Sequence, residues 1–428
     1  MNNKKNNFVL LVHFRDPFTH LGGAESVIRS HCEIFQKKGY EVYILFPVYK
    51  QLSLKRNKIT LRAWALLKEK KLTLLSHARQ MQTKIAALNK NGTCCGVFIH
   101  SLIFSNLDEL HAILSFRKSQ ILYLHDYSSC CAQYTLMKNG EDYCGDARLY
   151  DKKCDSCKYY NEGKRLKSSV DRFLSQIPCL YVVSPSENLA NNWGQAFPQY
   201  ANNVQIIGHK RCNGEYLENR NPLHGDEKIR VAFVGKAIKV KGFEIWKDAV
   251  DLISKENDNF SFFHFGFAPV PDENIDFVPV SIVKDGLNAM TNALRSQKIH
   301  IAFLFSIIPE TYSLTYYECM SANCFIVTSE LSGNIKDEVK RRHNGVVLPP
   351  TRDAVVDFLH NHHEMMAALN EFRQNGLIGP ECLTENDDFI MLLKDEVVDD
   401  FANVDIPIID VLKAKLVNVL YRIRYRQF

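Results

Sequence analysis

The sequence lacks a long uninterrupted apolar run. The longest, IAFLFSII at 301–308, falls well short of the roughly 18–20 residues that a membrane-spanning helix requires, and it is typical of a buried strand. The amino-terminal run FVLLV ends before His13 and is too short for the core of a secretion signal. We therefore expect a cytoplasmic protein, with any membrane contact peripheral and at the inner face of the cell membrane.

Internal repeats, low-complexity tracts and the composition of a disordered chain are also absent. Hydrophobic residues make up 46% of the chain and charged residues 24%, as in an ordinary globular protein. At 428 residues the chain exceeds the size at which a single hydrophobic core keeps growing, so we expect two domains.

Short β-rich runs alternate with helical stretches along both halves of the chain. One series runs from FVLLVHF to VQIIGH and the other from RVAFVG to GVVLPP, a rhythm typical of parallel α/β sheets. The polar stretch RCNGEYLENRNPLHGDEK predicts a hinge between them. We predict Rossmann-like domains at 1–225 and 226–400 and an amphipathic helix at 401–428. Because parallel sheets bind ligands at the carboxyl ends of their strands, the two doubly wound α/β domains should face each other across a ligand-binding cleft.

Positive charge is concentrated in one segment. The net charge is only +5, but residues 50–90 contain eleven Lys or Arg and a single acid, Glu69. We interpret this segment as a basic helical stretch, either a solvated face or a patch that meets an anionic membrane surface or a phosphate-bearing acceptor. Nucleic acid is not expected as a partner, because no aromatic stacking platform accompanies the charge.

Two strand-to-helix loops have the features of phosphate-binding loops. Gly22 and Gly23 stand between the first strand and its helix, where glycine lets the backbone approach an anion at the helix amino terminus. In VGKAIKVKGFE, Lys236 and Lys241 flank the corresponding loop of the second domain, and two cations over one helix start suit a diphosphate. The alternatives are ordinary turn geometry for the glycines and solvated surface lysines.

Two carboxylates follow the apolar strand IHIAFLFS. Glu310 and Glu318 are separated by seven residues; if residues 316–322 are helical, Glu318 lies in the helix and Glu310 in the loop before it. Both side chains can then point into the cleft at different depths, one toward the ribose hydroxyls and the other toward the transferred sugar. The alternative is a solvated pair of surface acids.

Together these motifs resemble retaining glycosyltransferase family four, whose members share the GT-B fold and include enzymes that build bacterial surface polysaccharides. The most specific stretch is ETYSLTYYECMSANCFIVTSELSGNIKDEVKRRHNGVVLPP at 310–350, which is similar to the family's signature of two glutamates with seven residues between them. The resemblance implies a catalytic role for Glu310 near the donor sugar and a place for Glu318 at the ribose. The residues that it implies at the diphosphate are Lys236 and Lys241, with Gly22 and Gly23 against it from the other domain.

The resemblance extends to the strand QILYLHD, whose terminal His125 matches the histidine that family members place beside the transferred sugar. The implied catalytic role of His125 is to orient a donor hydroxyl or to hydrogen-bond in the cleft, and it need not be the base. The sequence departs from the family pattern at three positions. Lys236 stands where Arg is usual, and Ser313 and Asn323 stand where Gly is usual.

Thirteen cysteines without a secretion signal argue against a disulfide framework, because the cytosol keeps thiols reduced. Five of them fall in an insertion at about 128–160. The pair Cys154 and Cys157, spaced CxxC, with Cys144 and with Cys131 or its neighbour Cys130, offers the four thiolates of a structural zinc site. Reduced thiols and a redox pair are the alternatives. We choose Cys131, Cys144, Cys154 and Cys157 as the zinc ligands.

We therefore predict a retaining, metal-independent glycosyltransferase that moves a hexose-type residue from a nucleoside diphosphate sugar to a glycan or lipid-linked acceptor in polysaccharide biosynthesis. No cofactor is expected for catalysis, since no Asp-x-Asp motif is placed to hold a metal ion near the diphosphate. Two alternatives remain. One is a nucleotide-sugar epimerase of the same fold, which needs no acceptor surface, and the other is a catalytically silent sugar-nucleotide binding protein.

The carboxyl-terminal sequence IIDVLKAKLVNVLYRIRYRQF predicts an amphipathic helix. Its apolar face consists of Ile408, Leu412, Leu416, Val419 and Ile423. We expect the helix to pack on the first domain or, alternatively, to lie on a membrane surface near a lipid-linked acceptor.

Overall fold

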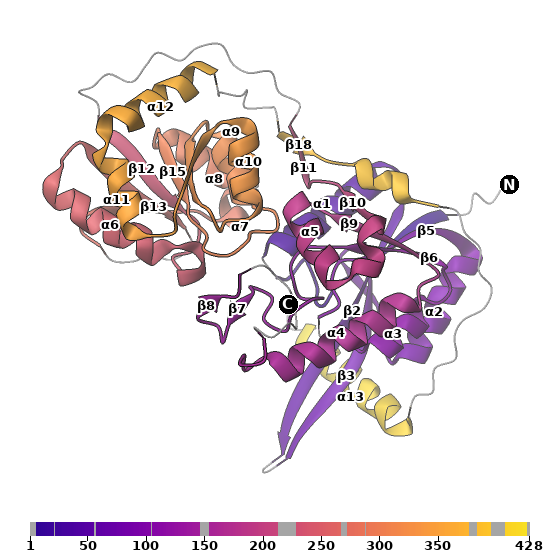
Figure 1. The fold of residues 1–428 in the computed structure, drawn as a ribbon. Coiled ribbons are helices and arrows are strands. Elements are labelled where there is room, and N and C mark those ends of the chain that lie inside the picture. The colour runs from indigo at the N-terminus through magenta and orange to yellow at the C-terminus, as the bar shows by residue number, and fades with distance from the viewer. Residues whose placement is uncertain are drawn as a thin grey trace. The chain divides into compact units, whose positions relative to one another are not determined.

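The computed structural model of the protein describes residues 6–20, 22–54, 57–103, 105–145, 154–212, 228–266, 272–286, 288–375, 383–394 and 407–425. The chain forms two compact units (Figure 1). Unit 1 comprises Met1–Pro185, Ala190–Ile207 and Asp387–Phe428, and unit 2 comprises Ser186–Leu189 and Gly208–Asn386. The chain therefore leaves unit 1 to build unit 2 and returns to unit 1 at its carboxyl end. Most of the predicted hinge, residues 213–227, lies outside the described residues.

Unit 1 is built on an eight-stranded sheet in the order β10-β9-β6-β5-β1-β2-β3-β4. Neighbouring strands from β10 to β2 are parallel, as the alternating β and helical runs predict. The strands are β1 (Asn6–Val12), β2 (Glu41–Leu54), β3 (Asn57–Lys68), β4 (Lys71–Ser76), β5 (Gly92–Ile99), β6 (Ser119–Tyr123), β9 (Cys179–Ser184) and β10 (Val204–Ile206). The helices of this part of the chain are α1 (Gly23–Lys37), α2 (Ala78–Asn91), α3 (Leu107–Leu114), α4 (Tyr160–Ser175) and α5 (Glu187–Ala196).

The prediction of one basic helical stretch after the second strand was wrong. β2 continues to Leu54 and pairs antiparallel with β3, and β3 pairs antiparallel with β4, so that α2 is the only part of residues 50–90 that the structure describes as helix. The physical reason is the alternation of side chains along β3. Leu61, Ala63, Ala65 and Leu67 are spaced by two, and all four lie in the hydrophobic core of unit 1, as one face of a strand requires.

Unit 2 contains a six-stranded sheet in the order β14-β13-β12-β15-β16-β17, in which all neighbours are parallel. The strands are β12 (Ile229–Val234), β13 (Phe260–Gly266), β14 (Ile275–Pro279), β15 (Ile301–Leu304), β16 (Phe325–Ser329) and β17 (Gly345–Leu348). The helices are α6 (Phe243–Glu256), α7 (Ile282–Asp285), α8 (Ala289–Ser296), α9 (Leu314–Ser321), α10 (Asn334–Arg342), α11 (Arg352–His360) and α12 (His362–Asn375). A short ribbon of β11 (Lys210–Cys212) and β18 (Leu383–Glu385) completes the unit.

Both faces of the unit 2 sheet are buried. Val231 and Phe233 belong to the core on one face, and the alternate residues Ala232 and Val234 belong to the core on the other. Such two-sided burial is typical of a parallel sheet covered by helices. It leaves the loops at the carboxyl ends of the strands as the place where polar side chains gather.

The carboxyl-terminal segment adds to unit 1. Phe389 and Leu392, in the turn η3 (Asp388–Leu392), and Ala414 and Val417, in α13 (Ile408–Tyr425), all belong to the core of unit 1. α13 packs against β3 and β4, which confirms that the predicted helix packs on the first half of the chain. Within the described residues, no helix combines the length and the hydropathy needed to cross a bilayer.

Candidate active site

The loop between β12 and α6 is the best-defined candidate for a phosphate-binding loop. Gly235 has φ +127° and Gly242, which precedes α6, has φ +72°, both values that favour glycine. A Cβ atom at Gly242 would lie 2.1 Å from the carbonyl oxygen of Phe305, so a side chain there would collide with the backbone that follows β15. The conformation of the loop therefore favours glycine at both Gly235 and Gly242.

Hydrogen bonds from two neighbouring strand ends fix this loop. The backbone N–H of Ile307 and the hydroxyl of Ser306 both donate to the Val240 carbonyl, at 3.0 Å each. His264, on β13, donates from Nε2 to the Gly235 carbonyl at 3.0 Å. Burial lowers the pKa of His264, so the ring is neutral near pH 7. His264 is a residue that the sequence analysis missed, and its only signal was a polar residue within an apolar strand.

Lys241 and Glu310 meet at this loop. The Lys241 ammonium lies 2.5 Å from Glu310 Oε1, and the two side chains are 37% and 15% exposed. Glu310 is held by its backbone, which accepts from the Asn334 N–H at 2.9 Å and donates to Ser332. Gly333 has φ +59°, and a Cβ there would lie 2.7 Å from the Glu310 nitrogen. Two residues that are 69 positions apart and that the sequence predicts at the donor are thus in direct contact, whereas Lys236 is exposed.

Glu318 lies in α9, the helix that begins after Glu310. Ser313 caps this helix, its hydroxyl accepting from the Tyr316 N–H at 3.2 Å, and Asn323 follows the helix with φ +59°. These contacts explain both departures from glycine in physical terms, since Ser is a favoured cap and Asn tolerates the left-handed conformation. Burial raises the pKa of the Glu318 carboxyl to about 7, against the opposing charge of Lys210.

In unit 1, Gly22 and Gly23 stand at the amino terminus of α1, as predicted. A Cβ at Gly22 would lie 2.2 Å from Glu25 Oε2, so a side chain there would displace the Glu25 carboxylate. At Gly23, by contrast, a Cβ would meet no atom within 4 Å, and its φ is not positive. A side chain at Gly22 would therefore disturb the Glu25 carboxylate rather than the backbone, and there is open space over Gly23.

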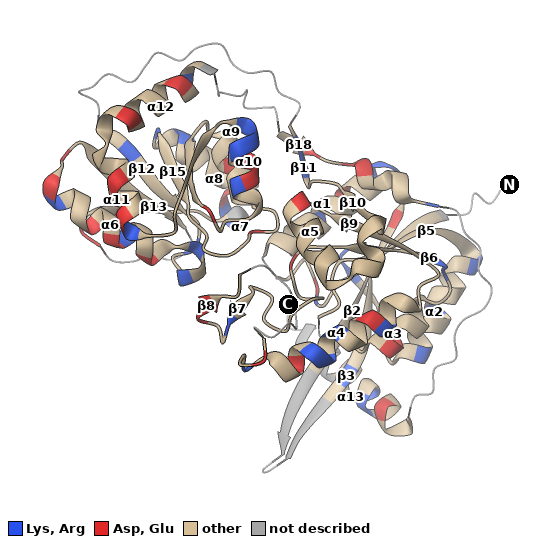
Figure 2. Ribbon diagram, in the orientation of Figure 1, with Lys and Arg blue, Asp and Glu red and all other residues tan. Residues whose placement is uncertain are grey.

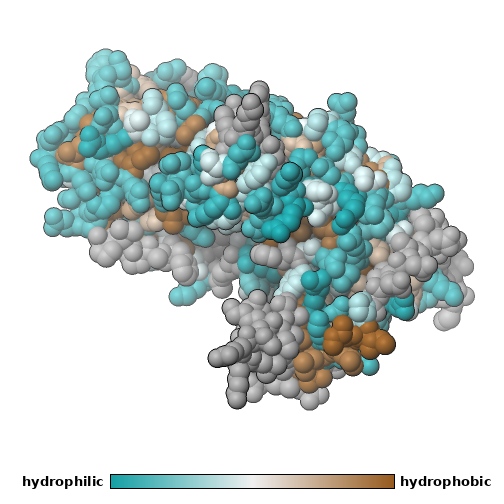
Figure 3. Space-filling view, turned by 60° about the horizontal axis from the view of Figure 1, so that its bottom comes forward, coloured by the Kyte–Doolittle hydropathy of each residue, from teal (hydrophilic) through white to brown (hydrophobic). Residues whose placement is uncertain are grey.

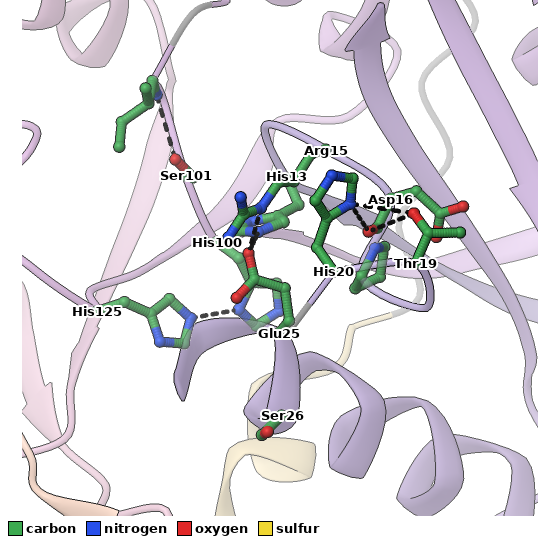
Figure 4. Close-up of polar contacts among 12 residues, drawn as sticks. His13, Arg15, Asp16, Thr19, His20, Glu25, Ser26, His100, Ser101 and His125 are labelled. Atoms are coloured by element: carbon green, nitrogen blue, oxygen red, sulfur yellow. Dashed lines mark hydrogen bonds and ion pairs between the residues drawn. The ribbon is translucent and has the colours of Figure 1, made fainter. Parts of the chain in front are cut away.

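A network of hydrogen bonds around the buried Glu25 carboxylate lies beside these glycines (Figure 4). Glu25 Oε1 accepts from His13 Nε2 at 3.1 Å and from Arg15 Nε at 2.7 Å. Burial acts to raise the pKa of Glu25, but these two hydrogen bonds outweigh it and hold the pKa well below its usual range. The sequence analysis missed all three residues. The available signal was an acid in the first turn of α1 together with a histidine directly after β1.

His125 follows β6 and contacts a second histidine. Its Nε2 lies 2.9 Å from Nδ1 of His100, which follows β5 (Figure 4). Burial lowers the pKa of His125 to about 3, and the nearby rings of His13 and His31 add to the effect. In this hydrogen bond one ring nitrogen donates and the other accepts. A neutral His125 is a weak base at pH 7. The arrangement suits hydrogen bonding to a substrate better than proton removal.

The cysteine-rich insertion forms a small hairpin of β7 (Met137–Lys138) and β8 (Asp142–Tyr143), which turns at Asn139 and Gly140, both with positive φ. Asn139 Oδ1 accepts from the backbone N–H of Lys158 at 2.9 Å and so ties the CxxC turn to the hairpin.

The thiols of this insertion influence one another. Burial raises the pKa of Cys131 to about 11, and Cys144, Cys154 and Cys157 all add to the rise. Burial also raises the pKa of Cys144 to about 11, with further contributions from Cys154 and Cys157. In the part of the chain that the structure describes, however, no three His, Cys, Asp or Glu side chains are grouped closely enough to hold a metal ion. The donor set suits zinc chemically, but the placement of the thiols does not form a complete ligand shell.

Neither a protein-family model nor a curated protein sequence matches the chain. Among solved structures, sucrose-phosphate synthase from Thermosynechococcus elongatus aligns over 99% of this chain and 100% of its own, with 12% identity and a TM-score of 0.51. A glycosyltransferase from Rickettsia africae aligns over 91% and 96%, with 11% identity and a TM-score of 0.51. Anabaena HepE in complex with UDP aligns over 87% and 93%, with 12% identity and a TM-score of 0.50. At these identities the likeness shows the fold alone, and the chain accordingly has the GT-B fold of glycosyltransferases, with two Rossmann-like domains.

Proposed function

We propose that the protein is a retaining glycosyltransferase that moves a hexose-type residue from a nucleoside diphosphate sugar to a glycan or lipid-linked acceptor in polysaccharide biosynthesis. The observation that carries the proposal is the contact of Lys241 with Glu310 at 2.5 Å, on loops that follow two neighbouring strands of unit 2. In a parallel sheet this is the edge at which ligands bind. At that edge, the pair brings together a cation and a carboxylate that can accept hydrogen bonds.

Each of these groups has a defined task in the proposed reaction. The Lys241 ammonium offsets the negative charge that develops on the leaving nucleoside diphosphate, which requires no metal ion. Glu310 accepts a hydrogen bond from a hydroxyl of the transferred sugar, and Glu318 accepts from the ribose hydroxyls. Lys236 adds a second cation at the diphosphate, as a point charge without the bidentate geometry of arginine.

Unit 1 carries two further groups that we propose to contact the donor. The space over Gly23, in which a Cβ would meet no atom within 4 Å, lets a ligand approach the backbone at the amino terminus of α1. His125, neutral at pH 7, hydrogen-bonds to the transferred sugar, and its contact with His100 fixes the ring orientation. HepE, whose fold this chain shares, was solved with UDP. That ligand supports a nucleoside diphosphate as the donor class.

A thermal-shift screen against UDP, GDP, dTDP, ADP and CMP and their sugar conjugates tests the donor assignment. A ligand that binds only the folded chain at about 100 times its Kd stabilises it by about 2.7 kcal/mol, which raises Tm by several degrees. We expect one nucleoside diphosphate and its sugar conjugate to raise Tm selectively. If none of them raises Tm, the chain does not bind a donor in the absence of acceptor. That result would favour a catalytically silent protein or an enzyme that binds its donor only together with the acceptor.

Product analysis separates the transferase from the epimerase. A transferase releases nucleoside diphosphate only when an acceptor or water is glycosylated, and a retaining one keeps the anomeric configuration of the donor, which NMR reads from the anomeric coupling constant. An epimerase instead converts one sugar nucleotide into another that differs at a single stereocentre, and it consumes no acceptor. Activity that persists in excess EDTA supports the metal-independent chemistry assigned to Lys241.

We also propose a structural zinc ion for Cys131, Cys144, Cys154 and Cys157, whose thiols raise one another's pKa but would have to move closer together to form the ligand shell. Because the pKa of Cys131 and of Cys144 is raised to about 11, zinc must displace protons from these thiols, and its affinity should rise with pH. Mass spectrometry of the purified protein should find about one zinc per chain, and the Cys154→Ser/Cys157→Ser variant should lose it. Cys179→Ser, outside the insertion, is the matched control. A metal-free chain with all four thiols reactive would support the reduced-thiol alternative instead.

A further inference from the structure

One face of α13 carries a row of large apolar side chains that the protein leaves in contact with solvent. Ile408, Leu412, Leu416 and Val419 are 80%, 54%, 42% and 56% exposed. Their spacing of four, four and three residues places them along one side of the helix, and the exposed Ile409 adjoins them. Single exposed apolar residues are ordinary, but these five form a continuous patch (Figure 3). We refer to them as the apolar stripe.

The apolar stripe is not the face that attaches α13 to the protein. Ala414 and Val417 are each 1% exposed and pack into the core of unit 1, and Asn418 Nδ2 donates to the Leu75 carbonyl of β4 at 2.8 Å. The helix is thus fixed through its smaller apolar residues, and its larger ones face outward. The apolar face that the sequence predicted is therefore the exposed face of the helix within the described residues.

Lysines flank the apolar stripe. At 100° per residue, Lys415 lies on one side of the stripe and Lys413 on the other, and Lys415 is exposed. Figure 2 shows both basic and acidic residues along α13. Lys413 pairs with Asp410 at 3.1 Å. The sequence repeats the pattern once more, with Ile423 between Arg422 and Arg424. An apolar face bordered by cations on both sides is the pattern of a helix that lies in the interface of an anionic bilayer.

Basic residues near an anionic membrane surface each contribute about 1 kcal/mol of attraction. The lysines beside the apolar stripe therefore favour an anionic occupant.

We propose that the apolar stripe of α13 and its flanking lysines form an interface with an anionic lipid bilayer. The apolar side chains enter the headgroup region, and the flanking cations reach the acidic headgroups. A second copy of the chain fits less well, because a symmetric contact through the stripe would bring the flanking lysines of both copies together. This interface goes beyond the proposed transfer reaction, and its test uses no sugar nucleotide, so the two proposals can fail separately.

Vesicle co-sedimentation of the full chain tests the interface. We expect binding to phosphatidylcholine vesicles that contain phosphatidylglycerol and much weaker binding to phosphatidylcholine alone. The Leu412→Ser/Leu416→Ser/Val419→Ser variant should lower the partition coefficient by about tenfold or more, since three exposed apolar side chains no longer enter the bilayer. Its Tm should change little, because none of the three residues belongs to the core of unit 1. Ile206→Ser/Met391→Ser, two exposed apolar residues elsewhere in unit 1, is the matched control.

Charge and self-association are tested separately. Lys415→Glu should weaken binding to anionic vesicles and leave the weak binding to phosphatidylcholine unaltered. Equal binding of the stripe variant and the unaltered chain would overturn the proposal, and so would the absence of binding to both kinds of vesicle. A dimer detected by light scattering that the stripe variant abolishes, without vesicle binding, would instead assign the stripe to a second copy of the chain.

Discussion

Replacing Lys241 by Ala is expected to lower kcat/KM for the sugar nucleotide by about 10²–10³-fold, the usual effect of removing one preorganised group that stabilises developing charge. The ammonium lies 2.5 Å from Glu310 and its side chain is 37% exposed. The pair therefore contributes only about 0–1 kcal/mol to folding. Steady-state kinetics with the donor found in the thermal-shift screen should show the loss, and circular dichroism should show an almost unchanged Tm.

Lys239→Ala is the control for this prediction. Lys239 belongs to the same short turn and is exposed, so its removal changes the charge of the loop equally without touching Glu310. Lys241→Arg should retain part of the activity, because it keeps the charge but not the position of the ammonium. Wild-type kcat/KM in Lys241→Ala, or an equal loss in Lys239→Ala, would exclude a specific contact of Lys241 with the leaving group.

Replacing Glu318 by Ala is expected to weaken nucleotide binding by about 10–100-fold near pH 8, where the carboxyl is ionised, since hydrogen bonds to a charged group contribute about 1.5–3 kcal/mol each. Isothermal titration calorimetry with the nucleoside diphosphate measures the change. Glu371→Ala, an exposed carboxylate on α12, should bind as the unaltered chain does. Undiminished affinity in Glu318→Ala would remove Glu318 from the ribose site.

The same carboxyl gives a pH-dependent stability difference. Burial raises its pKa from 4.5 to about 7, so the folded chain holds this proton more tightly than the unfolded chain does. The stability that protonation contributes is present at low pH and is lost as the pH rises from about 4.5 through 7. Glu318→Gln, which stays neutral, should therefore exceed the unaltered chain by up to about 3 kcal/mol near pH 8 and match it near pH 4. Melting curves at both pH values that show the same difference would indicate an unshifted carboxyl.

Most of the fold followed from periodicity in the sequence. The alternation of apolar strands and helices predicted both parallel sheets, because each strand buried on two faces is a short continuous apolar run. The failure at 50–68 has a definite cause. Lysines and arginines distributed along β2 and β3 suggested a solvated helix, whereas the spacing by two of Leu61, Ala63, Ala65 and Leu67 already favoured a strand. The number of basic residues at 50–68 was given more weight than the alternation of apolar residues, and the prediction failed for that reason.

Some features of the candidate site could be predicted from the sequence and others could not. Glycines and charged residues in strand-to-helix loops can be found from sequence, because their spacing follows the strand ends, and the contact of Lys241 with Glu310 agrees with that expectation. The His264 contact could not be found, because it depends on which strands are neighbours in the sheet. The His13–Glu25–Arg15 network lies within one strand-to-helix connection, and its sequence signal was missed. The carboxyl-terminal helix shows a further limit. Its apolar face was predicted, but periodicity does not tell whether such a face meets protein or something else.

The return of the chain to unit 1 constrains the order in which the protein can fold while it is being synthesised. Unit 2 is almost continuous in sequence, at Gly208–Asn386, whereas the core of unit 1 includes Phe389, Leu392, Ala414 and Val417. Domains fold as their sequences leave the ribosome. The core of unit 1 therefore cannot be completed until residues 387–428 have been synthesised, although its sheet is synthesised first. Unit 2 is complete before unit 1. A chain released early by a premature stop codon after unit 2 would carry a finished unit 2 and an incomplete unit 1 with uncovered apolar strands, a natural substrate for chaperones and proteases.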